Sequence, residues 1–197
     1  MKGSRIKNAQ RAFEEANVSQ AKKAHSKELI QKHMDEHSDD TRGKYLGEFV
    51  YGAIDGTITT FAVVAGAAGA SLSSGVVIIL GFANLIADGF SMACGNFLSE
   101  KTQRDYIAKE RKREEWEIEN VREGEVEEIR EIFRKKGFRG KDLSRAVEII
   151  ISDKRVWGDT MMAAELGLIE SPKSPWKTAA ATYVGFLAIG IIPLLSY

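Results

Sequence analysis

Three long apolar segments divide the chain, and charged stretches precede and separate them. The apolar segments cover residues 49–72, 75–98 and 178–197, and a charged block fills residues 100–177. A helix needs roughly 20 mainly apolar residues to cross a bilayer. Three such segments in a chain of 197 residues favour membrane spans over buried core helices. We therefore predict an all-α fold, in which a helical domain is inserted between the second and third of three membrane helices.

The basic residues predict the orientation of these spans. All 28 lysines and arginines lie before Tyr45 or between Lys101 and Lys177, whereas the connection at residues 71–75 carries no charge. Positively charged loops stay on the cytoplasmic side of a membrane. The sequence thus predicts four parts: a cytoplasmic helical extension (1–44), two membrane helices (45–99), a cytoplasmic helical domain (100–176) and a third membrane helix (177–197). The expected location is the plasma membrane or a vacuole-like membrane.

Composition adds little to this division. The formal net charge is zero, and the single cysteine, Cys94, excludes an intramolecular disulfide. Residues 1–44 are polar, lack the apolar core of a cleavable signal, and predict one partly amphipathic helix that ends at residues 39–43. His33 and His37, four residues apart, could bind a metal from one helical face. Without further ligands, a solvated face is the favoured interpretation.

Few helix-breaking residues interrupt the charged block. The second span should continue as a helix to Arg122, because residues 100–122 contain no glycine or proline. Gly124 is expected to break it, with further helices over residues 125–136, from Asp142, and over residues 156–166. Pro172 and Pro175 mark the return to the membrane at Trp176, an aromatic residue of the interfacial type.

Polar residues inside the spans are candidates for a transport path. Asp55 is an ionisable residue at membrane depth, which costs at least about 2.5–3.5 kcal/mol and so indicates function. The alternative is an aspartate near a helix end that reaches water. In the second span a polar stripe at helical spacing should face other helices or a water-filled path, and it contains Asn84, Asp88, Ser91 and Met92. Gly52 and Gly56 form a pair of small residues that permits close helix packing.

Carboxylates recur at helical spacing in the charged block. Glu114 and Glu117, and then Glu125 and Glu128, are three residues apart, so each pair shares a helix face. Met161-Met162-x-x-Glu165 adds two thioethers and a carboxylate. Mixed oxygen and sulfur donors suit Fe²⁺ or Mn²⁺ better than Mg²⁺ or Ca²⁺. The alternative is a solvated helix surface, which charge runs usually indicate; the recurrence of the glutamate pair after Gly124 and the added methionine motif weigh against it.

Several motifs together resemble the vacuolar iron transporter family, from Tyr45 to the C-terminus. They are Phe49-Val50-Tyr51-Gly52-x-x-Asp55-Gly56-x-x-Thr59-Thr60-Phe61, Ser91-Met92-Ala93-x-Gly95, Thr102-Gln103-Arg104-Asp105 and Met161-Met162-x-x-Glu165-Leu166-Gly167-Leu168. The resemblance implies export of Fe²⁺ or Mn²⁺ from the cytosol by homodimers that use proton exchange. It implies cytoplasmic metal ligands at Glu114, Glu117, Glu125, Glu128, Met161, Met162 and Glu165. It also implies that Asp55 and Met92 lie on the intramembrane metal path.

Two features depart from the family pattern. Many members carry a glutamate where this chain has Asn96, so one proton or metal group is missing. The family has five spans, whereas three are found here, so we expect a fragment, a reduced member, or a separate chain that supplies the remaining spans.

The leading hypothesis is a transporter of Fe²⁺ or Mn²⁺ that is not an enzyme and has no organic cofactor. Its expected partners are membrane lipid and a second copy of the chain, with no nucleic acid. The alternative is a membrane-anchored module that binds or stores metal without transport. A di-iron enzyme is weaker, because such sites use Glu-x-x-His and residues 100–177 contain no histidine.

Overall fold

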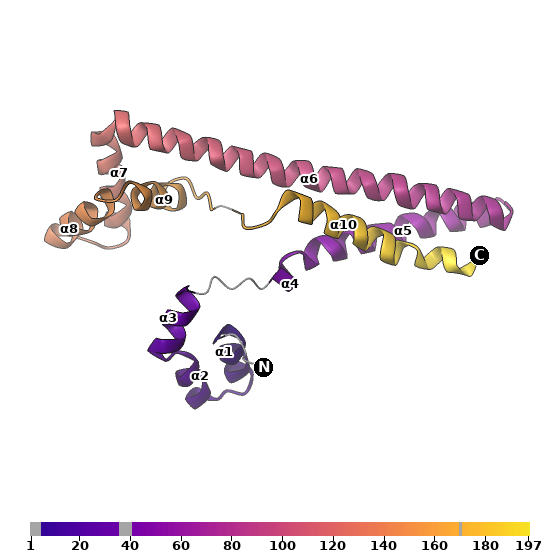
Figure 1. The fold of residues 1–197 in the computed structure, drawn as a ribbon, viewed down its shortest axis with the longest axis horizontal. Coiled ribbons are helices and arrows are strands. Elements are labelled where there is room, and N and C mark those ends of the chain that lie inside the picture. The colour runs from indigo at the N-terminus through magenta and orange to yellow at the C-terminus, as the bar shows by residue number, and fades with distance from the viewer. Residues whose placement is uncertain (1–4, 36–40, 170) are drawn as a thin grey trace. The chain divides into compact units, whose positions relative to one another are not determined.

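The computed structural model describes residues 5–35, 41–169 and 171–197 (Figure 1). All regular elements in these ranges are helices, which confirms the predicted all-α class. The chain forms two compact units, residues 1–44 and 45–197.

The first unit consists of short helices: α1 (Arg5–Glu14), α2 (Val18–Ala24), α3 (Lys27–Asp35) and α4 (Thr41–Lys44). The prediction of one continuous helix is wrong here, because Ala16 has a positive φ of 48° and Asn17 caps a new helix. The Asn17 side chain accepts a hydrogen bond from the Gln20 backbone N–H at 3.1 Å. Residues 41–43 are helical rather than a break. The His33 side chain, His37 and residues 39–40 lie outside the described residues.

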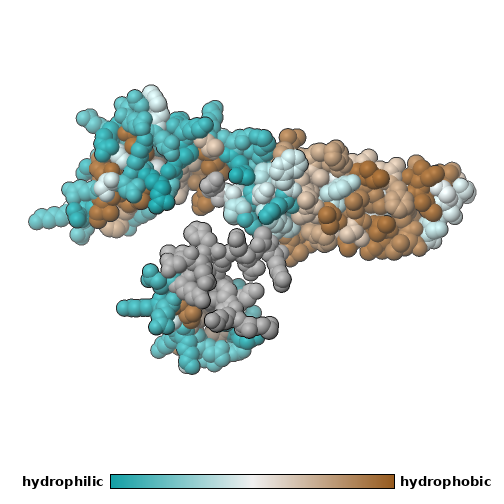
Figure 2. Space-filling model, viewed as in Figure 1, coloured by the Kyte–Doolittle hydropathy of each residue, from teal (hydrophilic) through white to brown (hydrophobic). Residues whose placement is uncertain are grey.

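Three helices of the second unit are long and apolar enough to cross a membrane. They are α5 (Leu46–Gly69), α6 (Ser74–Asn120) and α10 (Pro175–Gly190), which is followed by the short 3₁₀ helix η1 (Ile192–Ser196). Figure 2 shows a mainly hydrophobic surface over α5, α10 and the first half of α6. The second half of α6 is charged and continues straight from the apolar half, as predicted. At 47 residues, α6 is about 70 Å long.

Glycines bring the backbones of α5 and α10 into contact. A Cβ added to Gly52 would lie 2.1 Å from the carbonyl oxygen of Thr182. A Cβ added to Gly185 would lie at the same distance from the carbonyl oxygen of Phe49. The close approach predicted for Gly52 and Gly56 is thus confirmed, and it encloses Phe186 completely.

The charged block folds back on the end of α6 as three helices: α7 (Arg122–Lys135), α8 (Gly140–Ile151) and α9 (Lys154–Ala164). The break after α6 falls at Val121, so Gly124 lies inside the first turn of α7 rather than at the predicted break. Gly137, with a φ of 102°, follows the end of α7. Asp153 caps α9 by accepting hydrogen bonds from the N–H groups of Arg155 and Val156, at 2.8 and 3.2 Å. A buried core of Ile118, Ile129, Leu143, Val147, Trp157 and Met161 joins these helices.

Candidate metal site

Three carboxylates converge where α6 meets α7. Glu114 and Glu117 lie on one face of α6, and Glu125 lies in the first turn of α7. One oxygen of each lies within 4.8 Å of the other two. The convergence follows from the tight reversal at Val121, whose carbonyl accepts a hydrogen bond from the Glu125 N–H. This reversal sets Glu125 against the last turns of α6.

Two of these carboxylates are buried without full pairing. The exposed fraction is 1% for Glu114 and 6% for Glu125, and the Oε2 atom of each has no hydrogen-bond partner within the described residues. Burying an unpaired ionised group is costly, so such a group takes up a proton or binds a cation. The pKa of each is raised to about 7, chiefly because burial disfavours the charged form. Repulsion from Glu165 adds to the shift of Glu114, and repulsion from Glu114 adds to that of Glu125.

Arg113 forms ion pairs with two carboxylates of this cluster. Its Nη2 lies 3.2 Å from Glu114 Oε1, and it donates hydrogen bonds to Glu117 at 2.7 Å and Glu110 at 2.9 Å. Attraction to Arg113 lowers the pKa of Glu114, but less than burial raises it. Neither Arg113 nor Glu110 was predicted from the sequence. The signal was present, because Glu110 lies three residues before Arg113 and Glu117 lies four after it, which are the spacings of ion pairs along a helix.

Glu128 and Glu165 extend the carboxylate cluster toward solvent. Both are exposed, with Glu165 at the C-terminal end of α9. Burial raises the pKa of Glu165, and repulsion by Glu128 adds to the shift. Repulsion by Glu128 also raises the pKa of Glu114 and of Glu125. All five predicted glutamates therefore belong to one electrostatically coupled group.

Both methionines are buried, but in different surroundings. Met161 is fully buried in the core beside Ile118, Ile129 and Trp157. Met162 is 6% exposed and lines a cavity of about 500 Å³ between α6 and α9. Packing alone accounts for these positions, and the role of either sulfur as a ligand stays a prediction.

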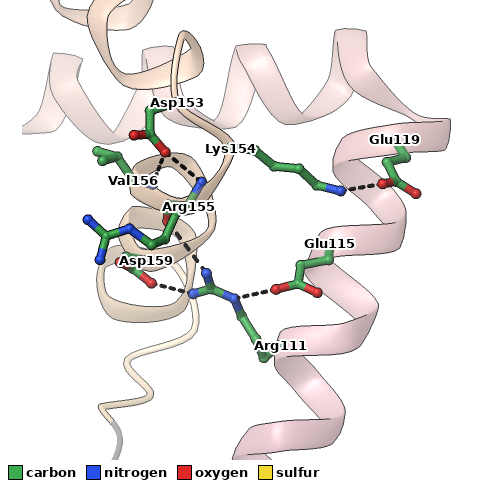
Figure 3. A network of polar contacts seen from close by, with 8 residues as sticks. All are labelled: Arg111, Glu115, Glu119, Asp153, Lys154, Arg155, Val156 and Asp159. Carbon is green, nitrogen blue, oxygen red and sulfur yellow. Dashed lines mark hydrogen bonds and ion pairs between the residues drawn. The ribbon is translucent and has the colours of Figure 1, made fainter.

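An ion-pair network holds α9 against α6 (Figure 3). Arg111 of α6 donates to Glu115 on the same helix and to Asp159 on α9, and Lys154 of α9 pairs with Glu119 of α6. This network fixes the helix that carries Met161 and Met162 relative to the helix that carries Glu114. Its long-range pairs, 35 and 48 residues apart, have no signal in the sequence.

The candidate path residues lie on the membrane helices α5 and α6. Asp55, Asp88 and Asn84 are half-buried, and the Asn84 amide donates to Thr59 Oγ1 on α5 at 3.3 Å. Met92 packs against the core of Val64, Ala67, Val77, Leu85, Phe186 and Leu194. A continuous route through these residues stays a prediction.

Known proteins resemble this chain over most of its length. The sequence model of the VIT family matches residues 46–197. A vacuolar iron transporter of Plasmodium berghei is 37% identical over 98% of this chain and 72% of its own length. The Toxoplasma gondii protein of the same name is 35% identical over 96% of this chain and 65% of its own. Vacuolar iron transporter 1 of Arabidopsis thaliana is 35% identical over 86% and 67%, respectively.

This chain thus spans roughly two thirds of the length of the relatives that it matches. The family match begins at Leu46, the first residue of α5, and includes the carboxylate cluster. The chain belongs to the VIT family.

Proposed function

We propose that this chain takes part in moving Fe²⁺ or Mn²⁺ out of the cytosol across a plasma membrane or vacuole-like membrane. The observation that carries the proposal is the carboxylate cluster of Glu114, Glu117 and Glu125, in which Glu114 and Glu125 are buried and two members lie on the same helix as a membrane span. The similarity to proteins named vacuolar iron transporters supports iron as the cargo. Residues 1–44 and 100–176 would face the cytosol, as the basic residues predict.

The cluster would capture the metal by exchanging protons for it. Near pH 7 the buried carboxyls of Glu114 and Glu125 are partly protonated, because the pKa of each is raised to about 7. A divalent cation satisfies their unpaired oxygens and displaces the protons, so binding releases protons into the cytosol. Glu128 and Glu165 would draw cations toward the buried ligands by their charge.

The ion would then pass the membrane helices beside Met92 and Asp55, with Asn84 and Asp88 on the same route. Asp55 and Asp88 supply charge at membrane depth, where an unpaired carboxylate is costly and a passing cation relieves the cost. We propose further that two copies form a homodimer and that proton exchange drives transport. The exposed apolar side chains along α5 and α6 are available to lipid or to the second copy; they include Tyr51, Ile54, Ile58, Phe61 and Ile86.

Metal uptake by proteoliposomes tests this proposal. The full chain should accumulate Mn²⁺, and Asp55→Ala should abolish uptake because the proposed path loses one of its two carboxylates at membrane depth. Glu123→Gln, which removes an exposed carboxylate of α7 outside the cluster, should leave uptake unchanged. Full uptake by Asp55→Ala would contradict the proposed path.

The second candidate is a membrane-anchored module that binds or stores metal. It is favoured by the completeness of the cluster within α6 and α7, which needs no group from the spans. In this case the parent chain should bind Mn²⁺ at the cluster, but proteoliposomes that contain either the parent chain or a variant should not accumulate Mn²⁺.

A further inference from the structure

A second polar cavity lies where α5, α6 and α10 meet, at the end of the spans from which the charged half of α6 extends. Its volume is about 280 Å³, and Glu48, Asn96, Glu100 and Thr178 are among its lining residues. The cavity contains two carboxylates and is separate from the cytoplasmic cluster, the residues of which lie further along α6 and on α7.

Two buried oxygens in this cavity lack partners among the described residues. Thr178 is 4% exposed, and its Oγ1 has no hydrogen-bond partner. The Oε2 atom of Glu48 is also buried and unpaired. Because most buried polar atoms in folded proteins are paired, unpaired oxygens on two residues that line one cavity point to a ligand there.

The chemistry of the lining selects the class of ligand. Glu48 and Glu100 supply carboxylate oxygens, and Thr178 supplies a hydroxyl. Asn96 donates its amide N–H to Thr182 Oγ1 at 2.7 Å, which leaves the amide oxygen as its possible ligand atom. Oxygen donors of these kinds are the preferred ligands of hard divalent cations.

One ammonium group already binds in this site. Lys173 Nζ donates to Glu48 Oε1, and Ser171 Oγ donates to Glu100 Oε1 at 2.6 Å. The adjacent Ser174 N–H donates to the Tyr45 hydroxyl at 2.9 Å. Residues 171–174, the last part of the connection from α9 to α10, therefore contact both carboxylates through Ser171 and Lys173. Two glutamates line the cavity and Lys173 pairs with one of them, while Arg104 lines the adjacent cavity beside Lys173.

We infer that this cavity binds a divalent cation through Glu48 and Glu100, with Thr178 and Asn96 as neutral ligands, and that Lys173 competes with the cation for Glu48. The inference rests on the proposed function, because it gives the transported ion a binding site between the cytoplasmic cluster and the spans. Binding would release residues 171–174 from the carboxylates. The segment that joins α9 to α10 would thus respond to the presence of the ion.

Mn²⁺ binding to the full chain in detergent micelles tests the inference, with free Mn²⁺ measured by electron paramagnetic resonance. The cytoplasmic cluster is first disabled by Glu114→Gln, Glu117→Gln and Glu125→Gln together. This triple variant should still bind one Mn²⁺ per chain. Adding Glu48→Gln or Glu100→Gln should weaken that binding at least about tenfold, since changes even outside the direct ligands alter metal affinity by about 10- to 100-fold.

Two further variants, also in the triple background, separate ligation from general charge effects. Thr178→Val keeps the shape and charge of the site and should also weaken Mn²⁺ binding. Lys173→Met removes the competing ammonium and should tighten binding roughly two- to fivefold, the effect of one partly exposed charge pair. Glu123→Gln serves as the matched control and should change nothing. Helix content by circular dichroism checks that each variant is folded.

The outcomes distinguish the inference from the proposed function. If the triple variant binds no Mn²⁺ while the parent does, the second site is overturned and the cytoplasmic cluster stands. If the triple substitution leaves all Mn²⁺ bound, the cluster is not the capture site, and the second site is still tested by Glu48→Gln. Unchanged affinity in folded Glu48→Gln and Glu100→Gln variants overturns the second site. Unchanged affinity in Lys173→Met overturns the competition.

Discussion

At the scale of residues, the raised pKa values of Glu114 and Glu125 make the metal-free protein sensitive to pH. Both folded-state pKa values are about 7, above the ordinary 4.5, so the folded state binds protons more tightly than the unfolded state. Stability without metal should therefore fall as pH rises from about 4.5 to 7. The loss is on the order of 3 kcal/mol for each group.

Thermal unfolding followed by circular dichroism checks this prediction. In a chelator, the midpoint should be higher at pH 5 than at pH 7.5. Mn²⁺ should restore stability at pH 7.5, because a ligand that binds only the folded state stabilises it, and should bind weakly at pH 5, where protons compete. Glu125→Gln should raise the metal-free midpoint at pH 7.5 and reduce the response to Mn²⁺. Equal Mn²⁺ affinity at the two pH values would contradict the carboxylate assignment.

Met161 and Met162 allow packing and ligation to be separated. Changing both to leucine preserves volume, so the free energy of unfolding should change by less than about 1.5 kcal/mol. Affinity for Fe²⁺ should fall, because leucine lacks the thioether, whereas the weak affinity for Mg²⁺ should not change. Glu165→Gln should weaken the binding of both ions. Titration calorimetry provides the measurement, and parental Fe²⁺ affinity in the double leucine variant would show that both residues serve packing only.

At the scale of elements, the contact between α5 and α10 depends on glycine. In Gly52→Ala the new methyl group would overlap the carbonyl oxygen of Thr182, and the two helices would have to separate. Such overpacking typically costs about 1–3 kcal/mol. Gly66→Ala on the same helix is the matched control, because an added Cβ there meets nothing within 4 Å. Thermal unfolding in detergent should show a lower midpoint for Gly52→Ala only, and equal midpoints would contradict the close packing.

The membrane helices and long α6 could be predicted because apolar length and absence of glycine or proline are local properties. The helix ends moved by several residues, because caps and turns depend on single contacts such as those of Asp153 and Asn17. The break at Val121 was missed, since Gly124 gives the stronger local signal but fits within a helix.

The candidate site could be predicted in part for the same reason. The pairing of Glu114 with Glu117 and of Glu125 with Glu128 follows from helical spacing, and the resemblance joined the two pairs into one site. The burial of Glu114 and Glu125 depends on how α7 folds back, which no local pattern specifies. The contact of Lys173 with Glu48 joins residues 125 apart in sequence, so it could be found only in the folded structure.

At the scale of the whole molecule, the continuity of α6 sets a fixed separation between the carboxylate cluster and the proposed path through the spans. The 22 residues from Met92 to Glu114 correspond to about 33 Å along the helix axis. This exceeds the Debye length of about 8 Å at physiological ionic strength, so the charges at the two ends do not alter one another appreciably. The separation is still short for diffusion. An ion released from the cluster would begin its diffusion about 33 Å from the proposed path instead of in bulk solution. In the proposed function, the cluster would thus act as a local reservoir for the membrane path when free metal in bulk solution is scarce.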